Sequence, residues 1–295
     1  MQKAILISLA ELPSDPLWLG RQPCPVIAYG EGESQSADVI VADLSAAKIL
    51  EQRINTWPIA AMTLVQVLRT SELLPVAQAL DVESMAYAAL QGGAEFRAWQ
   101  VAHTAEAMPL QEAGDALLLN RDGAMLEAIL NRVSSRNAIS VEMRDAWLEA
   151  LQLLEADESI TELRFRAKGS CFSVGGELRE FGSAPDTATA HWVRTVHSPA
   201  RMLAALSARL RFDVHGACIG SGIELPAFAG HVAAHKKSFF QLPELQLGLI
   251  PGAGGTVSMA RRIGRQRVAW MVLAGRRINA QTALAWGLID EILDR

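Results

Sequence analysis

Residues 215–256 read HGACIGSGIELPAFAGHVAAHKKSFFQLPELQLGLIPGAGGT, a segment with glycines at both ends. Glycine-rich stretches recur where a strand is expected to pass into a helix, at residues 171–181, 215–225 and 247–264. Glycine lets the backbone come close to a ligand, and the first amides of the next helix can bind it. Tight turns with close helix packing would explain any one stretch alone. None has the Gly-Lys-Ser/Thr of a P-loop or the G-x-G-x-x-G of dinucleotide-binding proteins.

The composition is that of a folded protein with one large domain or two modest ones. Of the 295 residues, half are apolar and a fifth are charged, and such a chain needs no disulfides to bury a core. The net charge of −5 disfavours a nucleic-acid binder that relies on a basic surface. No apolar run approaches the ~18 residues that span a bilayer, and Glu11 and Pro13 interrupt the apolar start of the chain. We expect a soluble, cytoplasmic protein with neither nucleic acid nor membrane as a partner.

The cysteines and histidines give no pattern of metal ligands. Cys24, Cys171 and Cys218 lie far apart with no C-x-x-C, and we interpret them as reduced thiols of a cytosolic protein. His231 and His235 lie four residues apart, but no third ligand is evident. We therefore expect no metal site.

Charge divides the chain into two parts. Residues 1–110 hold 6 Lys/Arg against 12 Asp/Glu, whereas residues 111–295 hold 21 against 20. We place an N-terminal accessory unit at residues 1–112, with strands near 25–30 and 37–43 and helical patterns after Trp57-Pro58. We predict a small, mostly helical α/β unit without a reactive group of residues. Its aromatic residues follow a spacing that favours core packing over a pocket lining: Tyr87, Phe96 and Trp99.

The second predicted unit, residues 113–295, alternates strands with helices. DALLLN and MLEAILNR indicate two strands joined by a turn at Asp122-Gly123. VEMRDAWLEALQLLEADES, residues 141–159, is an amphipathic helix with Trp147 on its apolar face. ITELRFRA, residues 160–167, is the next strand. This order predicts βα units with a largely parallel sheet.

The glycine-rich stretches, taken together and in order, resemble the crotonase superfamily of enoyl-CoA hydratases and isomerases. HGACIGSGIEL is similar to its N-G-x-a-x-G-G-G-x-E-L pattern, and QLPELQLGLIPGAGGT to its P-E-x-x-L-G-x-x-P-x-G-G-t pattern. LAGRRINAQTALAWGLIDEI, LNRVSSRNAIS and CFSVGGEL match further segments, so the resemblance covers about residues 115–295. It implies an α/β fold, a ββα spiral core that binds acyl-CoA, preceded by the small N-terminal unit.

The resemblance also implies a catalytic site. Similar proteins hold the thioester carbonyl oxygen with two backbone N–H groups, which match Gly176 and Ser221 in this sequence. Hydratases of the family use two glutamates, which match Glu224 and Glu244. Adding water across C2=C3 takes one base and one acid. We assign Glu244 to deliver the C2 proton and Glu224 to hold and activate the water. No metal or redox cofactor is implied, because coenzyme A is part of the substrate.

The resemblance implies further contacts with the acyl-CoA and a homo-oligomer, trimer or hexamer. The positions that match the family's substrate-binding segments are Arg136, Asn137, Ala138, Arg179, Gly175 and Gly220. A basic run between Pro251 and Ala280 is most simply a solvated face, with CoA phosphates or an oligomer interface as the alternatives. Its members are Arg261, Arg262, Arg265, Arg267, Arg276 and Arg277.

Several residues depart from the family's pattern. Pro226 follows directly after Glu224-Leu225, so the helix must start near Gly222 or bend, which could displace Glu224. Ser221 and Gly230 stand where relatives often have glycine and aspartate, and Glu177 replaces an aspartate. The chain ends at IDEILDR, where typical members continue with helices that trimerise and cover the acyl pocket. We expect the N-terminal unit to supply that cover or an interface, because apolar surface would otherwise be exposed.

Three functions fit these observations. The first is an enoyl-CoA hydratase, which the glutamate pair favours. The second is another reaction of the same fold, such as isomerisation, thioester hydrolysis, decarboxylation or cofactor-free oxygenation, since a stabilised enolate serves all of them. The third is a non-catalytic subunit that binds CoA or a partner protein. The acyl chain and the pathway are not decided by the sequence.

Overall fold

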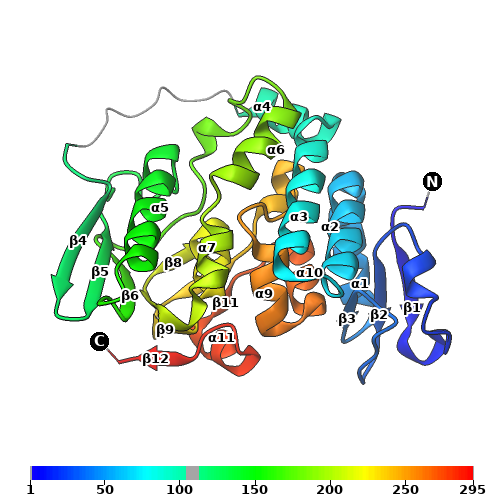
Figure 1. The fold of residues 1–295 in the computed structure, drawn as a ribbon. Helices are drawn as coiled ribbons and strands as arrows, with labels where there is room; N and C mark the ends of the chain where they lie inside the picture. Colours follow the sequence, from blue (N-terminus) through cyan, green and yellow to red (C-terminus); the bar gives the residue numbers. More distant parts are fainter. Residues whose placement is uncertain (1, 104–112, 295) are drawn as a thin grey trace.

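The computed structural model describes residues 2–103 and 113–294, and the largest sheet in these parts has six strands and lies at one side of the molecule (Figure 1). The strand order is β12-β9-β7-β6-β5-β4, and every pair is parallel except β4 with β5. The prediction of a hairpin followed by a largely parallel sheet is confirmed. The strands are β4 Leu117–Asp122, β5 Met125–Leu130, β6 Glu162–Ala167, β7 Leu210–Val214, β9 His231–His235 and β12 Glu291–Leu293.

A second, small sheet runs beside the first in the order β11-β10-β8. The chain passes from β7 in the large sheet to β8 (Ala217–Ile219) in the small one and then into helix α8 (Ser221–Glu224). The chain crosses again from the large sheet to the small one between β9 and β10 (Phe239–Gln241), and β10 pairs in parallel with β8. Strand β11 (Ile278–Asn279) pairs antiparallel with β10. These repeats form the ββα spiral that the sequence predicts.

Aromatic packing joins helix α5 (Val141–Ala156) to the large sheet. Ser140 caps the helix by accepting a hydrogen bond from the Met143 amide at 3.2 Å, which satisfies one of the free N–H groups of the first turn. Trp147 is fully buried, with its ring centre 4.5 Å from that of Phe165 and 5.6 Å from that of Phe212. The predicted amphipathic helix and its buried Trp147 are confirmed.

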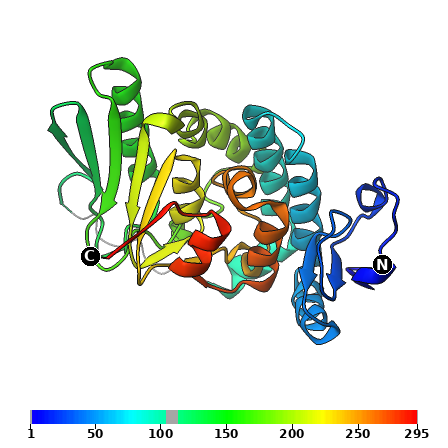
Figure 2. The same ribbon diagram turned by 90° about the horizontal axis from the view of Figure 1, so that it is seen from below.

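The N-terminal part is mostly helical, as predicted, with a small parallel sheet at its start. Strands β2 (Val26–Tyr29) and β3 (Val39–Val41) lie where the sequence places them, and β1 (Ile5–Ser8) is an addition to that prediction. Four helices follow: α1 Leu44–Thr56, α2 Pro58–Ser71, α3 Val76–Gln91 and α4 Ala94–Ala102. The N-terminal sheet of β1, β2 and β3 lies at the opposite end of the molecule from β4 in both views (Figures 1 and 2).

The N-terminal helices pack against the helices of the C-terminal part. Helices α2 and α3 contact α9 (Gly255–Ile263), and α1 and α2 contact α10 (Arg265–Ala274). One hydrophobic cluster runs through both parts, with Leu64 and Leu68 on one side and Val257 and Met271 on the other. The predicted boundary after residue 112 borders residues 104–112, which lie outside the described parts. The remaining helices are α6 Thr187–Val196, α7 Ala200–Ala205 and α11 Ala280–Trp286.

The prediction of a solvated face for the basic run is right for four arginines, which are exposed, and wrong for Arg262 and Arg265; the exposed ones are Arg261, Arg267, Arg276 and Arg277. Arg265 is buried and donates to the Glu72 carboxylate at 3.0 Å and to the carbonyls of Gln35 and Ala37 at 2.7 and 3.0 Å. Arg262 pairs with Asp290 at 3.0 Å. These side chains fasten neighbouring parts of the fold to one another.

In the parts of the chain that the structure describes, no helix is both long and apolar enough to cross a membrane.

Candidate active site

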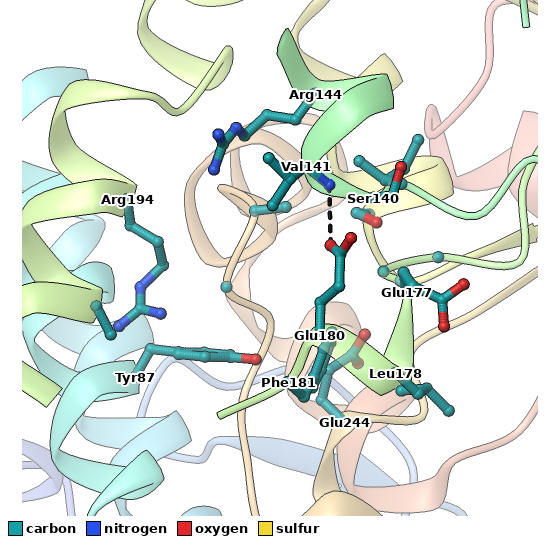
Figure 3. Close-up of a pocket in the computed structure, with 18 of the residues that line it drawn as sticks. Tyr87, Ser140, Val141, Arg144, Glu177, Leu178, Glu180, Phe181, Arg194 and Glu244 are labelled. Atoms are coloured by element: carbon teal, nitrogen blue, oxygen red, sulfur yellow. Dashed lines mark hydrogen bonds between the residues drawn. The ribbon is translucent and has the colours of Figure 1, made fainter. Parts of the chain in front are cut away.

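A cavity of about 570 Å³ opens where the ends of the spiral turns meet helices α3, α5 and α6 (Figure 3). Both sequence-predicted glutamates line it, and so do both members of the predicted oxyanion hole. The structure therefore brings together six of the predicted site residues: Gly175, Gly176, Gly220, Ser221, Glu224 and Glu244.

Two backbone amides in the cavity wall have no acceptor among the described residues. They belong to Gly176, in the loop after residue 174, and to Ser221, the first residue of α8. The first amides of a helix have no intrahelical acceptor. Two such donors can bind a thioester oxygen and stabilise it as negative charge develops. The Ser221 hydroxyl is also buried without a partner in these parts of the chain.

Two glycines keep the segments behind these amides close together. Gly220 has φ +51°, and a Cβ there would lie 2.7 Å from Glu244 Oε1. Gly175 has φ +96°, and a Cβ there would lie 2.8 Å from the Ile219 carbonyl oxygen. Both conformations favour glycine over residues with a side chain. Gly220 therefore leaves the space that the Glu244 carboxylate occupies.

Glu224 is the last residue of α8 and is 2% exposed. The helix begins at Ser221 and ends before Pro226, which opens a separate 3-10 turn. The predicted effect of Pro226, displacement of Glu224, does not occur, because Glu224 still lines the cavity. Its Oε2 accepts hydrogen bonds from the amides of Ala253 and Gly255 at 2.8 and 3.0 Å. Burial and the neighbouring Glu244 carboxylate raise its pKa well above the usual range, and the two amides oppose that rise.

Glu244 begins a 3-10 turn, Glu244–Leu247, and is 8% exposed. Its Oε2 is buried and has no hydrogen-bond partner in the described parts of the chain. Burial raises its pKa to about 8. A Cβ at Gly220 would lie 2.7 Å from Glu244 Oε1 and 3.8 Å from Glu224 Oε1. Both carboxylates therefore approach the same backbone position from different elements.

A third buried carboxylate, Glu83 on α3, was not predicted. Its Oε1 accepts from the Gly254 amide at 2.7 Å, and its Oε2 from the amide and hydroxyl of Thr256 at 2.9 and 2.6 Å. Burial raises its pKa to about 7. Glu83 lies three residues after Leu80 and four before Tyr87, so it shares their helix face. A charged residue on that apolar face was the sequence signal for it.

Tyr87 and Arg194 form another part of the cavity wall (Figure 3). The Arg194 guanidinium lies over the Tyr87 ring, 4.5 Å from its centre, and burial raises the pKa of the tyrosine. The prediction that the N-terminal aromatics serve core packing is right for Phe96, which is buried in the core. It is incomplete for Tyr87, which is buried but also lines the cavity. The expected cover from the N-terminal part is thus present at α3.

Four predicted substrate-binding residues do not line the cavity: Arg136, Asn137, Ala138 and Arg179. Asn137 is buried and ties loops together, with its amide nitrogen 2.8 Å from the Lys168 carbonyl oxygen. Arg136 and Asn137 have positive φ, at 54° and 55°. Arg179 pairs with Glu177, which lowers the pKa of that carboxyl group. Within residues 2–103 and 113–294, no group of three side chains is placed to hold a metal ion.

The spiral of ββα turns and the paired amides above two glutamates define a crotonase-type α/β protein. The family model "Enoyl-CoA hydratase/isomerase" matches residues 120–295, and the chain belongs to that family.

Individual relatives cover only part of this chain. A 2,3-dehydroadipyl-CoA hydratase of Escherichia coli is 31% identical over 182 residues, 60% of this chain and 68% of the relative. An enoyl-CoA isomerase/hydratase of Mycosarcoma maydis is 32% identical over 173 residues, 56% of this chain and 63% of that protein. The crystal structure of an enoyl-CoA hydratase of Mycobacterium smegmatis superimposes with a TM-score of 0.57 at 27% identity, over 61% of this chain and 71% of the other. The chain thus spans roughly two thirds of the length of such proteins.

Proposed function

We propose that this protein is an enoyl-CoA hydratase that adds water across the C2=C3 bond of a 2-enoyl-CoA thioester. The observation that carries the proposal is the meeting of Glu224 and Glu244 beside the two free amides of Gly176 and Ser221 in one cavity. Family membership supports an enoyl-CoA substrate, and the glutamate pair supports hydration.

The thioester carbonyl oxygen accepts hydrogen bonds from the amides of Gly176 and Ser221. When a nucleophile attacks C3, negative charge moves from the double bond onto this oxygen and an enolate forms. Donors that are already in place stabilise the charge without reorganising, and one such donor contributes about 3–4 kcal/mol to the transition state.

The two glutamates act as base and acid. Burial and the Glu244 carboxylate raise the pKa of Glu224, and the two amides on its Oε2 oppose that rise. With Glu244 protonated, the repulsion between the two carboxylates is absent, so Glu224 acts as the base and takes a proton from water as the water oxygen bonds to C3. Glu244, whose pKa of about 8 keeps it protonated at neutral pH, gives its proton to C2 of the enolate. The product is the 3-hydroxyacyl thioester. A proton then returns from Glu224 to Glu244, through solvent, to restore the starting state. These steps require no metal or redox cofactor.

Isomerisation of the double bond is the second candidate. One observation favours it: Glu224 Oε2 is held by two loop amides, as a structural carboxylate would be. In that case Glu244 alone would move a proton from one carbon to another, and water would not be added.

The test follows the conjugated enoyl-thioester absorbance with a short 2-enoyl-CoA and an aromatic one. Wild type is compared with Glu224→Gln, Glu244→Gln and the control Glu155→Gln, an exposed residue of α5. Hydration predicts a 3-hydroxyacyl product. It also predicts a large loss of rate in Glu224→Gln and in Glu244→Gln, and an unchanged rate in Glu155→Gln. Activity that survives Glu224→Gln with a shifted double bond as product would replace hydration by isomerisation.

We also propose that the chain acts in the cytoplasm as a homo-oligomer, a trimer or hexamer. Light scattering of the purified protein measures the assembly, and a monomeric mass would contradict this part of the proposal.

A further inference from the structure

Arg194 lies in the cavity wall, and one edge of its guanidinium group has no hydrogen-bond acceptor among the described residues. Its Nη1 donates to Gln91 Oε1 at 3.0 Å, and its guanidinium lies over the Tyr87 ring. Nε and Nη2 are buried, and no residue in the described parts of the chain accepts a hydrogen bond from them. A buried donor without an acceptor is costly, and a cation more so.

The two nitrogens form the side of the guanidinium that fits a carboxylate. Their N–H groups point the same way and match the two oxygens of one carboxylate group. Three other arginines of this protein use the same edge in this manner, Arg69 with Asp38, Arg132 with Glu142 and Arg179 with Glu177. At Arg194 no ion pair is formed with any described residue.

The nearby acid Glu83 does not fill this role. It interacts with Arg194 through space, and the positive charge opposes the rise in the pKa of Glu83. Each Glu83 oxygen, however, accepts hydrogen bonds from the loop at Gly254 and Thr256. Both of its oxygens are therefore engaged elsewhere. The aromatic face of Tyr87 compensates part of the desolvation of the cation, and it provides no hydrogen-bond acceptor for the Nε/Nη2 edge.

Tyr87 lies between Arg194 and the segment that begins at Gly252. A Cβ at Gly252 would lie 2.4 Å from the Tyr87 ring, so the ring packs directly on the loop whose next residues hold Glu224. Figure 3 shows Tyr87 and Arg194 together, on the other side of the view from Ser140, Glu177 and Leu178. Only the Tyr87 ring thus separates Arg194 from the segment that holds Glu224, the proposed base.

We propose that the Nε/Nη2 edge of Arg194 binds a carboxylate at the far end of the acyl group. The substrate is then a 2-enoyl-CoA thioester that carries a second, terminal carboxylate; this conclusion on substrate class rests on the hydratase function proposed above. Arg194 lines the cavity, and its Nε and Nη2 are buried in the wall, so the proposal requires this edge to turn toward the acyl group when the substrate binds. A carboxylate fits this place better than a CoA diphosphate does, because the diphosphate carries more charge to be desolvated.

The test compares substrates of equal chain length that end in a carboxylate or in a neutral carboxamide. We expect wild type to favour the carboxylate by about 10- to 100-fold in kcat/KM. Arg194→Met should bring the ratio close to one by losing activity on the carboxylate alone, and Arg194→Lys should keep part of the preference. Arg164→Gln, on β6 and paired with Glu162, should leave the ratio unchanged. A wild-type ratio near one, or a ratio that Arg194→Met does not change, overturns the proposal.

A binding measurement separates this proposal from the proposed reaction. Saturated thioesters with the same two ends bind without reacting, so their affinities by calorimetry report on Arg194 whatever the chemistry is. A carboxylate preference that Arg194→Met removes supports the carboxylate site even where no hydration is seen. An equal loss of affinity for both thioesters would place Arg194 on a CoA phosphate and overturn the proposal.

Discussion

Glu83 and Glu224 accept hydrogen bonds from alternate amides of one segment, the loop that leads into α9 and the first residues of that helix. Glu224 accepts from Ala253 and Gly255, and Glu83 accepts from Gly254 and Thr256. The two carboxylates come from α3 and α8, so the loop is fixed by an element from each part of the chain. The position of the proposed base therefore depends on a helix that precedes the family-matched region.

Glu83→Gln should impair both stability and turnover. A glutamine keeps one acceptor oxygen, so one of the two sets of loop donors loses its partner, at a cost of about 1–3 kcal/mol in the free energy of unfolding. The loop then holds Glu224 less firmly, and kcat should fall more than KM rises. Denaturant unfolding and steady-state kinetics measure the two effects. Asp81→Asn, in the same helix and half-exposed against Arg201, is the control and should change either quantity little. Normal kinetics in Glu83→Gln would show that the loop does not need this contact.

The free energy of unfolding should fall as pH rises from about 5 to 8. Glu83 and Glu244 have folded pKa values raised to about 7 and about 8 by burial, whereas in the unfolded chain they ionise near 4.5. Between these values the folded state holds more protons, so its stability decreases with pH. The contribution of these two groups to the free energy of unfolding is greatest below pH 4.5 and is lost as the pH rises through their folded pKa values. Glu244→Gln should flatten this part of the profile, and urea unfolding across the range measures it. An unchanged slope in the variant would contradict the raised pKa.

Gly220→Ala should reduce activity by displacing Glu244. The new methyl group would lie 2.7 Å from Glu244 Oε1, in a backbone conformation of φ +51°. Gly123→Ala is a matched control, because Gly123 has φ +58° but no atom within 4 Å of the added Cβ. Both variants should lose about 1–2 kcal/mol of stability to backbone strain. Only Gly220→Ala should also lose at least about tenfold in kcat, roughly 1.4 kcal/mol of barrier. Equal kinetics in the two variants would mean that Glu244 tolerates the displacement.

Arg265→Met should loosen the N-terminal sheet. The substitution removes a buried guanidinium that donates to the Glu72 carboxylate and to the carbonyls of Gln35 and Ala37. The loss of these charge-assisted hydrogen bonds should cost about 2–4 kcal/mol. Limited proteolysis should then cut near residue 36 faster than in wild type. Arg267→Met, which removes a more exposed arginine over Trp286, serves as the control. Equal cleavage rates in both variants would rule out the fastening role of Arg265.

The fold of the C-terminal part could be predicted because its strands and helices follow from patterns among residues that are close together in the sequence. The alternation in β6 and the apolar face of α5 each follow from neighbouring residues, and Glu224 and Glu244 lie within recognisable glycine-rich motifs. Glu83 and Arg194 could not be placed this way. Their roles depend on how α3 and α6 pack against a loop far away in the sequence, and neither stands in a motif. Strand β1 was missed because its pattern is short and its partner, β2, begins 21 residues after it starts.

The hydrogen bond from Gly254 to Glu83 joins residues 171 positions apart in the chain. During synthesis, α3 therefore leaves the ribosome long before the loop that it will hold. The proposed base, Glu224, therefore acquires its final surroundings only when α3 has docked on this loop. Recovery of catalysis after refolding should follow this late docking step and lag behind the return of secondary structure.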